Sequence, residues 1–336
     1  MRNYILGVDG GGTKTHCALF DTDGNLIDML KWGPTNHEAL KGSFSELADE
    51  LHKMLECLSD RNGMDTGGIS KSVFGMAGVD TKRQNAVILE IIRGLGIKDF
   101  ILCNDAYLGI KAGCPEGYGI CAINGTGCTV AGIDDKGNML QIGGLGRLTG
   151  DCGGGNYLGT CAVSEVYNSL FKEGRHTLMV ELMFEKLCIQ SGADFVDGLT
   201  QATGSGKYRI KDLNGIVFEA ANLGDAAALE ILEKMGIENG KSINGIIKHL
   251  DFNMDSSIPV ILVGSIYTKG ENPKGIDSLK AHVINANPGI NFDFKLLKQP
   301  PVAGAAVWGI KEALGKDYRN SIHEKVLDVI QRAAGY

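Results

Sequence analysis

A run of three glycines near the N-terminus, Gly10-Gly11-Gly12, lies between Asp9 and the polar pair Thr13-Lys14. Glycines let backbone N–H groups approach phosphate oxygens without a Cβ in the way. In a dinucleotide fold or a Walker-type loop, such a run opens a helix whose N-terminus holds the phosphate. Here, instead of a helix, the glycines are followed by a short, β-prone segment at residues 14–20. The pattern therefore predicts a β-hairpin that grips a phosphate, and a tight turn without a ligand is the alternative.

A second copy of this stretch follows at residues 119–142. Aligning Thr13 with Thr126 gives an offset of 126 − 13 = 113, and no gap is needed. The same offset pairs five more identical residues: Gly12 with Gly125, Ala18 with Ala131, Asp21 with Asp134, Gly24 with Gly137, and Asn25 with Asn138. The chain is therefore predicted to contain two related halves, each with a phosphate hairpin. Two facing hairpins predict a nucleotide held in the cleft between two domains.

Polar side chains are also expected where predicted strands end. Asn36 and His37 fall in a loop after the third predicted strand, where they could meet a ligand, although Asn36 could instead cap the following helix. Asp105 leaves the short buried strand at residues 100–103. A carboxylate at the C-terminal end of such a strand faces the crevice where ligands bind in open α/β sheets. The alternative for Asp105 is a simple helix N-cap.

A glycine-rich segment at residues 143–155 contains Asp151. So much glycine beside a carboxylate predicts backbone shaped around a ligand. A flexible linker is the alternative. We expect Leu145 and Leu148 to be packed, which would argue against a linker.

The elements that position these residues follow an α/β pattern. Leucines recur at three and four positions between Leu40 and Leu58, which predicts an amphipathic helix. Further strands are expected at 69–75, 100–103, 259–263 and 292–297, and helices from Asp80 or Thr81 to 93 and at 156–172, 176–190, 212–222, 225–250, 304–314 and 321–334. Gly215 within a predicted helix and Gly264-Ser265 after a buried strand indicate places where a ligand approaches the backbone.

Length and composition exclude several classes of protein. A chain of 336 residues suits two domains, here 1–116 and 117–336, with the last helix able to pack back on the first. A net charge of −7 without a basic run argues against nucleic-acid binding. We expect no signal peptide and no membrane span. Nine scattered cysteines without a C-x-x-C pair predict reduced thiols in a cytoplasmic protein.

Taken together, these motifs resemble those of N-acetylglucosamine kinases in the BadF/BadG/BcrA/BcrD ATPase group of the actin-like, hexokinase-like superfamily. The segments that carry the resemblance are Val8 to Lys14, Thr35-Asn36-His37, Asn104-Asp105-Ala106, Asn124-Gly125-Thr126-Gly127, Gly143 to Gly146 with Gly150-Asp151, and Val263-Gly264-Ser265. The likeness implies two ribonuclease H-like domains with a cleft between them. It also implies an ATP-dependent kinase that phosphorylates a hydroxyl, expected to be the 6-OH, of a small amino sugar.

The resemblance implies a role for each site residue. ATP phosphates would be held by Gly11, Gly12, Thr13, Lys14, Gly125, Thr126 and Gly127, and the adenosine would lie between Gly215 and Gly264-Ser265. Asp9 would orient Mg²⁺ through water. The sugar would be bound by Asn36, His37, Asp105, Gly144, Leu145, Gly146 and Asp151, and Asp105 would be the catalytic base.

Two departures from the family pattern leave the acceptor open. Cys152 follows Asp151 where the family usually has glutamate, and Leu145 replaces an aromatic residue found in many amino-sugar kinases. Glucosamine, another N-acetylhexosamine or a cell-wall amino sugar all remain candidates beside N-acetylglucosamine. The runner-up function is an ATPase that activates an acyl-CoA dehydratase through an iron–sulfur cluster, although Cys152 and Cys161 lack the arrangement expected for one. A non-catalytic sugar sensor and a homodimer are also left open.

Overall fold

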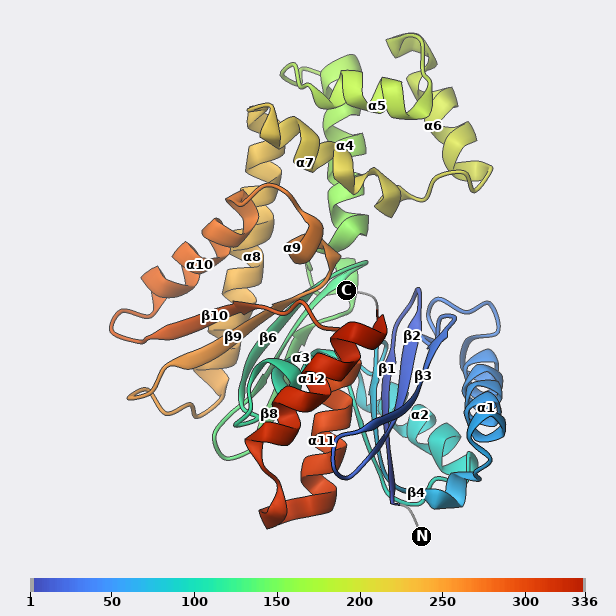
Figure 1. Cartoon of the computed structure of the whole chain (residues 1–336). Helices are drawn as coiled ribbons and strands as arrows, with labels where there is room; N and C mark the ends of the chain where they lie inside the picture. Colours follow the sequence, from blue (N-terminus) through green and yellow to red (C-terminus); the bar gives the residue numbers. More distant parts are fainter. Residues whose placement is uncertain (1–2, 335–336) are drawn as a thin grey trace.

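Two mixed five-stranded sheets with matching strand orders form the centre of the molecule in a computed structural model that describes residues 3–334 (Figure 1). The first sheet has the order β3-β2-β1-β4-β5 and the second β10-β9-β6-β7-β8. In each, a three-stranded antiparallel meander is extended by two parallel strands. The strands are β1 (Tyr4–Gly10), β2 (Thr15–Asp21), β3 (Leu26–Trp32), β4 (Ile69–Met76), β5 (Phe100–Cys103), β6 (Gly119–Asn124), β7 (Cys128–Ile133), β8 (Met139–Gly143), β9 (Ile258–Val263) and β10 (Phe292–Leu296). The predicted α/β class and both meanders are confirmed.

The internal duplication is visible in the hydrogen bonds of two turns. The Asp21 carboxylate accepts from the backbone N–H of Asn25 at 2.9 Å and from its side chain at 2.7 Å. The Asp134 carboxylate accepts the same two bonds from Asn138, at 2.8 and 2.9 Å. β2 begins at Thr15 and β7 at Cys128, again 128 − 15 = 113 positions apart. The sequence offset therefore aligns two copies of one β-meander.

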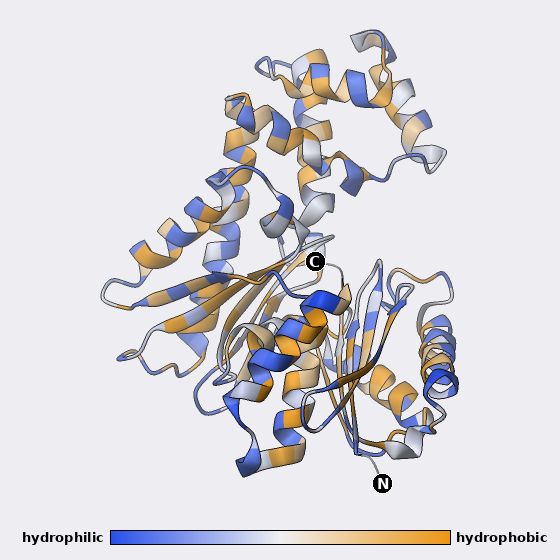
Figure 2. Ribbon diagram, in the orientation of Figure 1, coloured by the Kyte–Doolittle hydropathy of each residue, from blue (hydrophilic) through white to orange (hydrophobic). Residues whose placement is uncertain are grey.

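Helices cover both faces of the first sheet. Leu6 and Val8 of β1 pack with residues of α1 (Ser43–Asn62) and α2 (Lys82–Gly94), whereas Ile5 points to the other face. That other face is covered by α11 (Val302–Leu314) and α12 (Asn320–Ala334), which come from the C-terminal end of the chain. Figure 2 shows the strands of both sheets rich in hydrophobic residues, whereas α12 alternates between hydrophobic and hydrophilic positions.

Two helices exchanged between the halves join the sheets. α3 (Ala106–Gly113) follows β5 of the first sheet but packs on β6, β7 and β9 of the second. α11 follows β10 of the second sheet but packs on β1 and β4 of the first. The two helices cross at Gly304, where an added Cβ would lie only 2.0 Å from the Leu108 carbonyl oxygen. This contact ties the two halves together.

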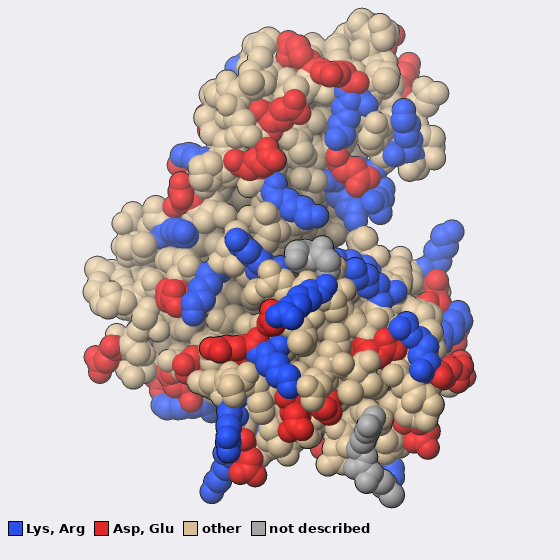
Figure 3. Space-filling view, in the orientation of Figure 1, with Lys and Arg blue, Asp and Glu red and all other residues tan. Residues whose placement is uncertain are grey.

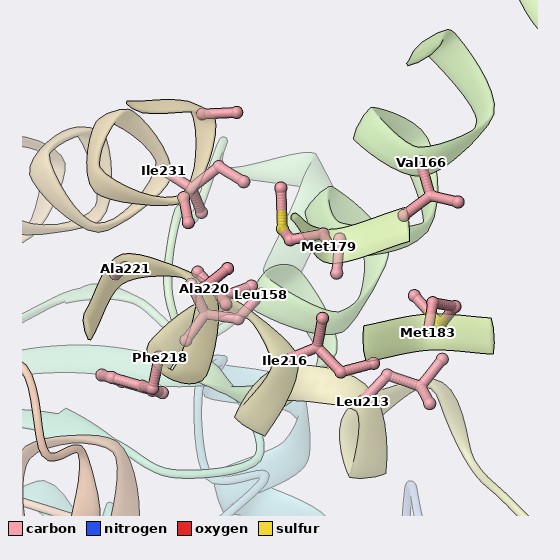
Figure 4. Close-up of a cluster of buried hydrophobic side chains, with 14 of the residues drawn as sticks. Leu158, Val166, Met179, Met183, Leu213, Ile216, Phe218, Ala220, Ala221 and Ile231 are labelled. Atoms are coloured by element: carbon pink, nitrogen blue, oxygen red, sulfur yellow. The ribbon is translucent and has the colours of Figure 1, made fainter. Parts of the chain in front are cut away.

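A helical unit is inserted between β8 and β9 and projects from the second sheet (Figure 1). Its helices are α4 (Gly154–Phe171), α5 (Met179–Leu187), α6 (Phe195–Gly204) and α7 (Asn214–Asn222). They surround a core that includes Leu158, Met179 and Ile216 (Figure 4). The long helix α8 (Ala226–His249) leads back to the second sheet, whose outer face it covers with α10 (Lys274–Ala286). The predicted helices are present, whereas α6, α9 (Ser265–Lys269) and α10 were not predicted.

Two further expectations can be compared with the described residues. None of the helices in residues 3–334 is both long enough and apolar enough to cross a bilayer. All nine cysteines are free thiols.

Candidate active site

The first glycine turn is a hairpin, as predicted, and not the start of a helix. The N–H of Gly11 donates to the Lys14 carbonyl at 3.1 Å, which closes the turn between β1 and β2. The Thr35 N–H donates to the Gly11 carbonyl at 3.0 Å, and the Ala77 N–H donates to the Gly10 carbonyl at 2.8 Å. Neighbouring loops thus fasten the base of the hairpin, while Gly12, Thr13 and Lys14 at its tip are exposed. Its backbone is both fixed and accessible.

The second hairpin joins β6 to β7 at Gly125-Thr126-Gly127. The Gly125 N–H donates to the Gly127 carbonyl at 2.9 Å, and the N-terminus of α4 is tied to the turn because the Gly155 N–H donates to the Gly125 carbonyl at 2.8 Å. A Cβ added at Gly125 or Gly127 would meet no other atom within 4 Å, and neither residue has a left-handed φ. Folding does not require glycine at these two positions. The open space beside these two backbones would let a phosphate approach them closely.

Asp105 lies at the start of α3 but does not cap it. Its side chain makes no capping hydrogen bond, whereas the Asn104 side chain accepts from the Ala106 N–H at 2.9 Å. Asp105 thus occupies the N-cap position without a side-chain cap bond, and the Asn104 side chain holds the Ala106 N–H instead. Burial, together with the nearby carboxylates of Asp9 and Asp80, raises the pKa of Asp105 to about 8. Such a carboxyl group can exchange a proton near neutral pH, as a general base must.

Asp80 is a site residue that sequence reasoning did not single out as functional. It precedes the helix α2, whose cap is Thr81, with a capping box to Gln84. Asp80 instead accepts from Gln141 of β8 at 2.6 Å and from Asn104 at 3.0 Å. Burial raises its pKa to about 6, although the bond from Gln141 opposes the shift. Asp80 therefore joins the two sheets directly beside Asp105.

The signal for Asp80 was present in the chain order. Asp80 follows β4 after a three-residue loop, just as Asp105 follows the neighbouring strand β5. Carboxyl ends of parallel strands meet at one edge of a sheet, so both acids belong to the same crevice.

The glycine-rich segment at 143–155 is an ordered loop, and the linker alternative is wrong. The Asp151 carboxylate accepts from the N–H groups of Gly144 at 2.9 Å and Gly146 at 2.8 Å, and from the Thr149 hydroxyl at 2.8 Å. A Cβ at Gly144 would lie 2.6 Å from a carboxylate oxygen of Asp80, so the loop packs against the first half of the chain.

The predicted packing of Leu148 is wrong. Leu148, which we expected to be packed, is 90% exposed, and Leu145 is only partly buried. Hydrogen bonds to Asp151 hold this loop, and they make leucine packing unnecessary.

The Asn36-His37 loop lies beside the first hairpin. The Asn36 side chain accepts from the Glu38 N–H at 2.9 Å and so closes a turn ahead of α1, whose N-cap is Gly42. Asn36 therefore does not cap that helix. His37 is 6% exposed and stacks on Phe44 with ring centroids 4.1 Å apart, and burial lowers its pKa. Burial therefore favours the neutral ring, and the stacking gives it a packing role.

The residues predicted to flank an adenosine all lie in the second half of the chain. Gly215 is the second residue of α7 and is exposed. A Cβ added there would meet no other atom within 4 Å. Ser265 is exposed at the start of α9. Gly264 is required by packing, because an added Cβ would lie 2.3 Å from the Asn124 carbonyl oxygen.

A cation at this site would depend on few protein ligands. No cluster of three or more His, Cys, Asp or Glu side chains suited to a metal occurs within residues 3–334. Asp9 is the next-to-last residue of β1, beside the first hairpin, and keeps a side chain that is 16% exposed. Mg²⁺ is typically held by one or two carboxylates, several waters and the phosphates of its substrate, so these residues fit that ion.

Comparison with known proteins finds matches along most of the chain. The sequence model of the BadF/BadG/BcrA/BcrD ATPase family matches residues 6–309. An N-acetylmuramic acid/N-acetylglucosamine kinase of Clostridium acetobutylicum is 28% identical over 249 residues, which is 74% of this chain and 80% of the relative. An N-acetyl-D-glucosamine kinase of Dictyostelium discoideum is 25% identical over 280 residues, covering 80% and 87%.

A crystal structure from Chromobacterium violaceum, provisionally named an N-acetylglucosamine kinase, superimposes with a TM-score of 0.65 at 20% identity. The match covers 92% of this chain and 99% of that one. The likeness shows a two-domain, actin-like ATPase fold, as the sequence predicted.

Proposed function

The chain belongs to the BadF/BadG/BcrA/BcrD ATPase family, and from this premise we propose that it is an ATP-dependent kinase whose acceptor is an amino sugar, most specifically N-acetylglucosamine. Two of its relatives are kinases named for that sugar, and one of these is also named for N-acetylmuramic acid. The observation that carries the proposal is the combination of two exposed glycine hairpins, one from each half, with the carboxyl group of Asp105.

The hairpins would hold the nucleotide through their backbones. The exposed tips of the two hairpins, Gly12 to Lys14 and Thr126-Gly127, present backbone and hydroxyl groups suited to phosphate oxygens. Phosphoryl transfer proceeds through a loose transition state, so positioning and charge neutralisation provide most of the rate enhancement. The adenosine would lie against Gly215 and Gly264-Ser265 of the second half.

Asp105 would accept the proton of the acceptor hydroxyl. Its raised pKa results from burial and from neighbouring acids, which is how enzymes adjust a carboxylate to work near neutral pH. Asp80 helps to set that pKa and fixes the crevice through Gln141. Closure of the two halves would exclude water, which otherwise competes as acceptor.

Mg²⁺ bound with ATP would neutralise charge on the phosphates, and Asp9 is the residue we propose to orient it. Asp9 lies within reach of His16, whose Nδ1 is 3.8 Å from its carboxylate. His16 is 3% exposed, so its position is fixed by packing and it limits the rotation of Asp9.

The sugar would bind between the Asn36 loop and the Gly144–Asp151 loop. Asn36, Asp105, Gly144 to Gly146 and Asp151 can accept from and donate to paired hydroxyls. We retain His37 as a proposed wall of this site, acting through its packed ring. Since ATP and free amino sugars are cytoplasmic metabolites, we place the enzyme in the cytoplasm, in keeping with its free thiols.

An ATP-consumption assay across amino sugars and hexoses tests the proposal. We expect turnover with N-acetylglucosamine to exceed turnover with glucose, and product analysis should find phosphate on the sugar. N-acetylmuramic acid and glucosamine belong in the same panel, because Cys152 and Leu145 alter this side of the site. ATP hydrolysis without any sugar phosphate would contradict a kinase and favour the ATPase-activator function.

A further inference from the structure

One cation from the inserted helical unit reaches the first hairpin. The Nζ of Lys211 donates to the Thr13 hydroxyl at 3.1 Å, although the two residues are 198 positions apart. In the space-filling view, basic side chains lie on both sides of the notch between the upper helices and the lower part of the molecule (Figure 3). The contact therefore crosses from the second half of the chain to the tip of the first phosphate hairpin.

The backbone of Lys211 is held firmly against α4. It lies in a short 3-10 helix, Ile210–Leu213, and its carbonyl accepts from the Asn214 side chain. A Cβ added at Gly155 would lie 3.2 Å from the Lys211 carbonyl oxygen. A Cβ added at Gly159 would overlap the carbonyl oxygen of Ile210. Only the flexible side chain of Lys211 is free to adjust.

The same helix terminus holds the second hairpin. Gly155 and Asn156 at the N-terminus of α4 donate to the carbonyls of Gly125 at 2.8 Å and Thr126 at 3.1 Å. Lys211 thus packs beside the support of the second hairpin while its ammonium group touches the first. Its charged end lies where the phosphates would be held if both hairpins grip them.

We propose that Lys211 binds a phosphoryl oxygen of the nucleotide, as a cation supplied to the first hairpin from the opposite side of the cleft. This inference rests on the proposed function, because it needs a triphosphate between the hairpins. The Thr13 hydroxyl is a neutral acceptor, and no carboxylate forms an ion pair with Lys211 among residues 3–334. A phosphate is the stronger partner, since charge-assisted hydrogen bonds are roughly twice as strong as neutral ones.

The consequence is a link between nucleotide binding and closure. Lys211 belongs to the second half and Thr13 to the first, so a phosphate that bonds both draws the halves together. The Lys211–Thr13 bond places the ammonium group at the tip of the first hairpin, within reach of such a phosphate.

Calorimetric binding of ATP, ADP and AMP, measured without sugar, tests this role. Lys211→Met should weaken ATP binding by about tenfold or more and leave AMP binding within twofold. Lys211→Arg should restore most of the affinity for ATP, because it keeps the charge. Lys207→Met is the matched control, since Lys207 is an exposed lysine nearby that stacks over Tyr208 and makes no bond to the hairpin. Lys207→Met should leave the affinities for ATP, ADP and AMP unchanged.

The outcomes separate this inference from the proposed function. If the wild-type protein binds ATP and the affinity of Lys211→Met for ATP is within twofold of the wild-type value, Lys211 is only a contact between the two halves. The inference is then wrong. An equal loss for ATP and AMP would also overturn it, because it would indicate a structural defect. If the wild-type protein binds no nucleotide at all, the proposed function fails and takes this inference with it.

Discussion

At the scale of single residues, the proposed chemistry depends on carboxyl groups whose surroundings differ. Asp105 is relieved of capping by Asn104, and burial with Asp9 and Asp80 nearby raises its pKa to about 8. The sequence indicated Asp105 because it follows a buried strand. It could not indicate the partners of Asp80, because Gln141 is 61 positions away and meets Asp80 only when the two sheets come together.

Replacing Asp105 should separate binding from chemistry. Asp105→Asn keeps the shape but cannot accept a proton, so kcat should fall by about a hundredfold to ten-thousandfold. ATP affinity, measured by calorimetry, should stay near the wild-type value, because the hairpins are untouched. A variant with near-normal turnover would remove Asp105 as the base.

The raised pKa of Asp105 also predicts how stability depends on pH. An unfolded aspartate has a pKa of about 3.9, so the folded state binds this proton more tightly and loses stability as pH rises from about 4 through about 8. Asp105→Asn removes this loss, and its free energy of unfolding should exceed the wild-type value by about 1 to 3 kcal/mol at pH 8. Urea titrations at pH 5 and pH 8 check the trend. A gain that is larger at pH 5 would contradict it.

At the scale of elements, the two β-meanders were predictable because their signal is local. Turn residues recur at one offset, and each strand is short and apolar. The helical unit was predicted less completely. α6 contains two glycines and four polar residues besides its apolar ones, and it takes its stability from the core around Phe195, which only the folded unit supplies. The exposure of Leu148 was also beyond prediction, because Asp151 holds that loop.

The second hairpin offers a substitution that the free protein should tolerate. A Cβ at Gly127 meets nothing within 4 Å, so Gly127→Ala should leave the melting temperature nearly unchanged. If phosphate approaches this backbone, the same methyl group should weaken ATP binding by about tenfold. Gly204→Ala, at an equally open glycine on α6, is the control and should affect neither property. Unchanged ATP affinity in Gly127→Ala would argue against this hairpin as a phosphate site.

At the scale of the whole molecule, two exchanged helices hold the halves in register. α3 packs on the second sheet and α11 on the first, and Asp80–Gln141 and Lys211–Thr13 bridge the same halves near the site. We propose that the chain divides near residue 117, and that α11 and α12, which pack on the first sheet, belong with the first half. Sequence patterns predicted two halves from the repeat, but the exchange depends on contacts between segments far apart in the chain.

The crossing of α3 and α11 should tolerate no added side chain. A Cβ at Gly304 would lie 2.0 Å from the backbone oxygen of Leu108, so Gly304→Ala must separate the helices. We expect a loss of about 1 to 3 kcal/mol in the free energy of unfolding, measured by urea titration. Gly204→Ala again serves as the control. Wild-type stability in Gly304→Ala would show that the helices do not pack as closely as described.

The most direct measurement is a crystal structure with a nonhydrolysable ATP analogue and N-acetylglucosamine. We expect phosphate oxygens within hydrogen-bonding distance of residues 11–13 and 125–127, and an acceptor hydroxyl beside Asp105. A nucleotide bound away from either hairpin, or a sugar hydroxyl pointing away from Asp105, would contradict this expectation.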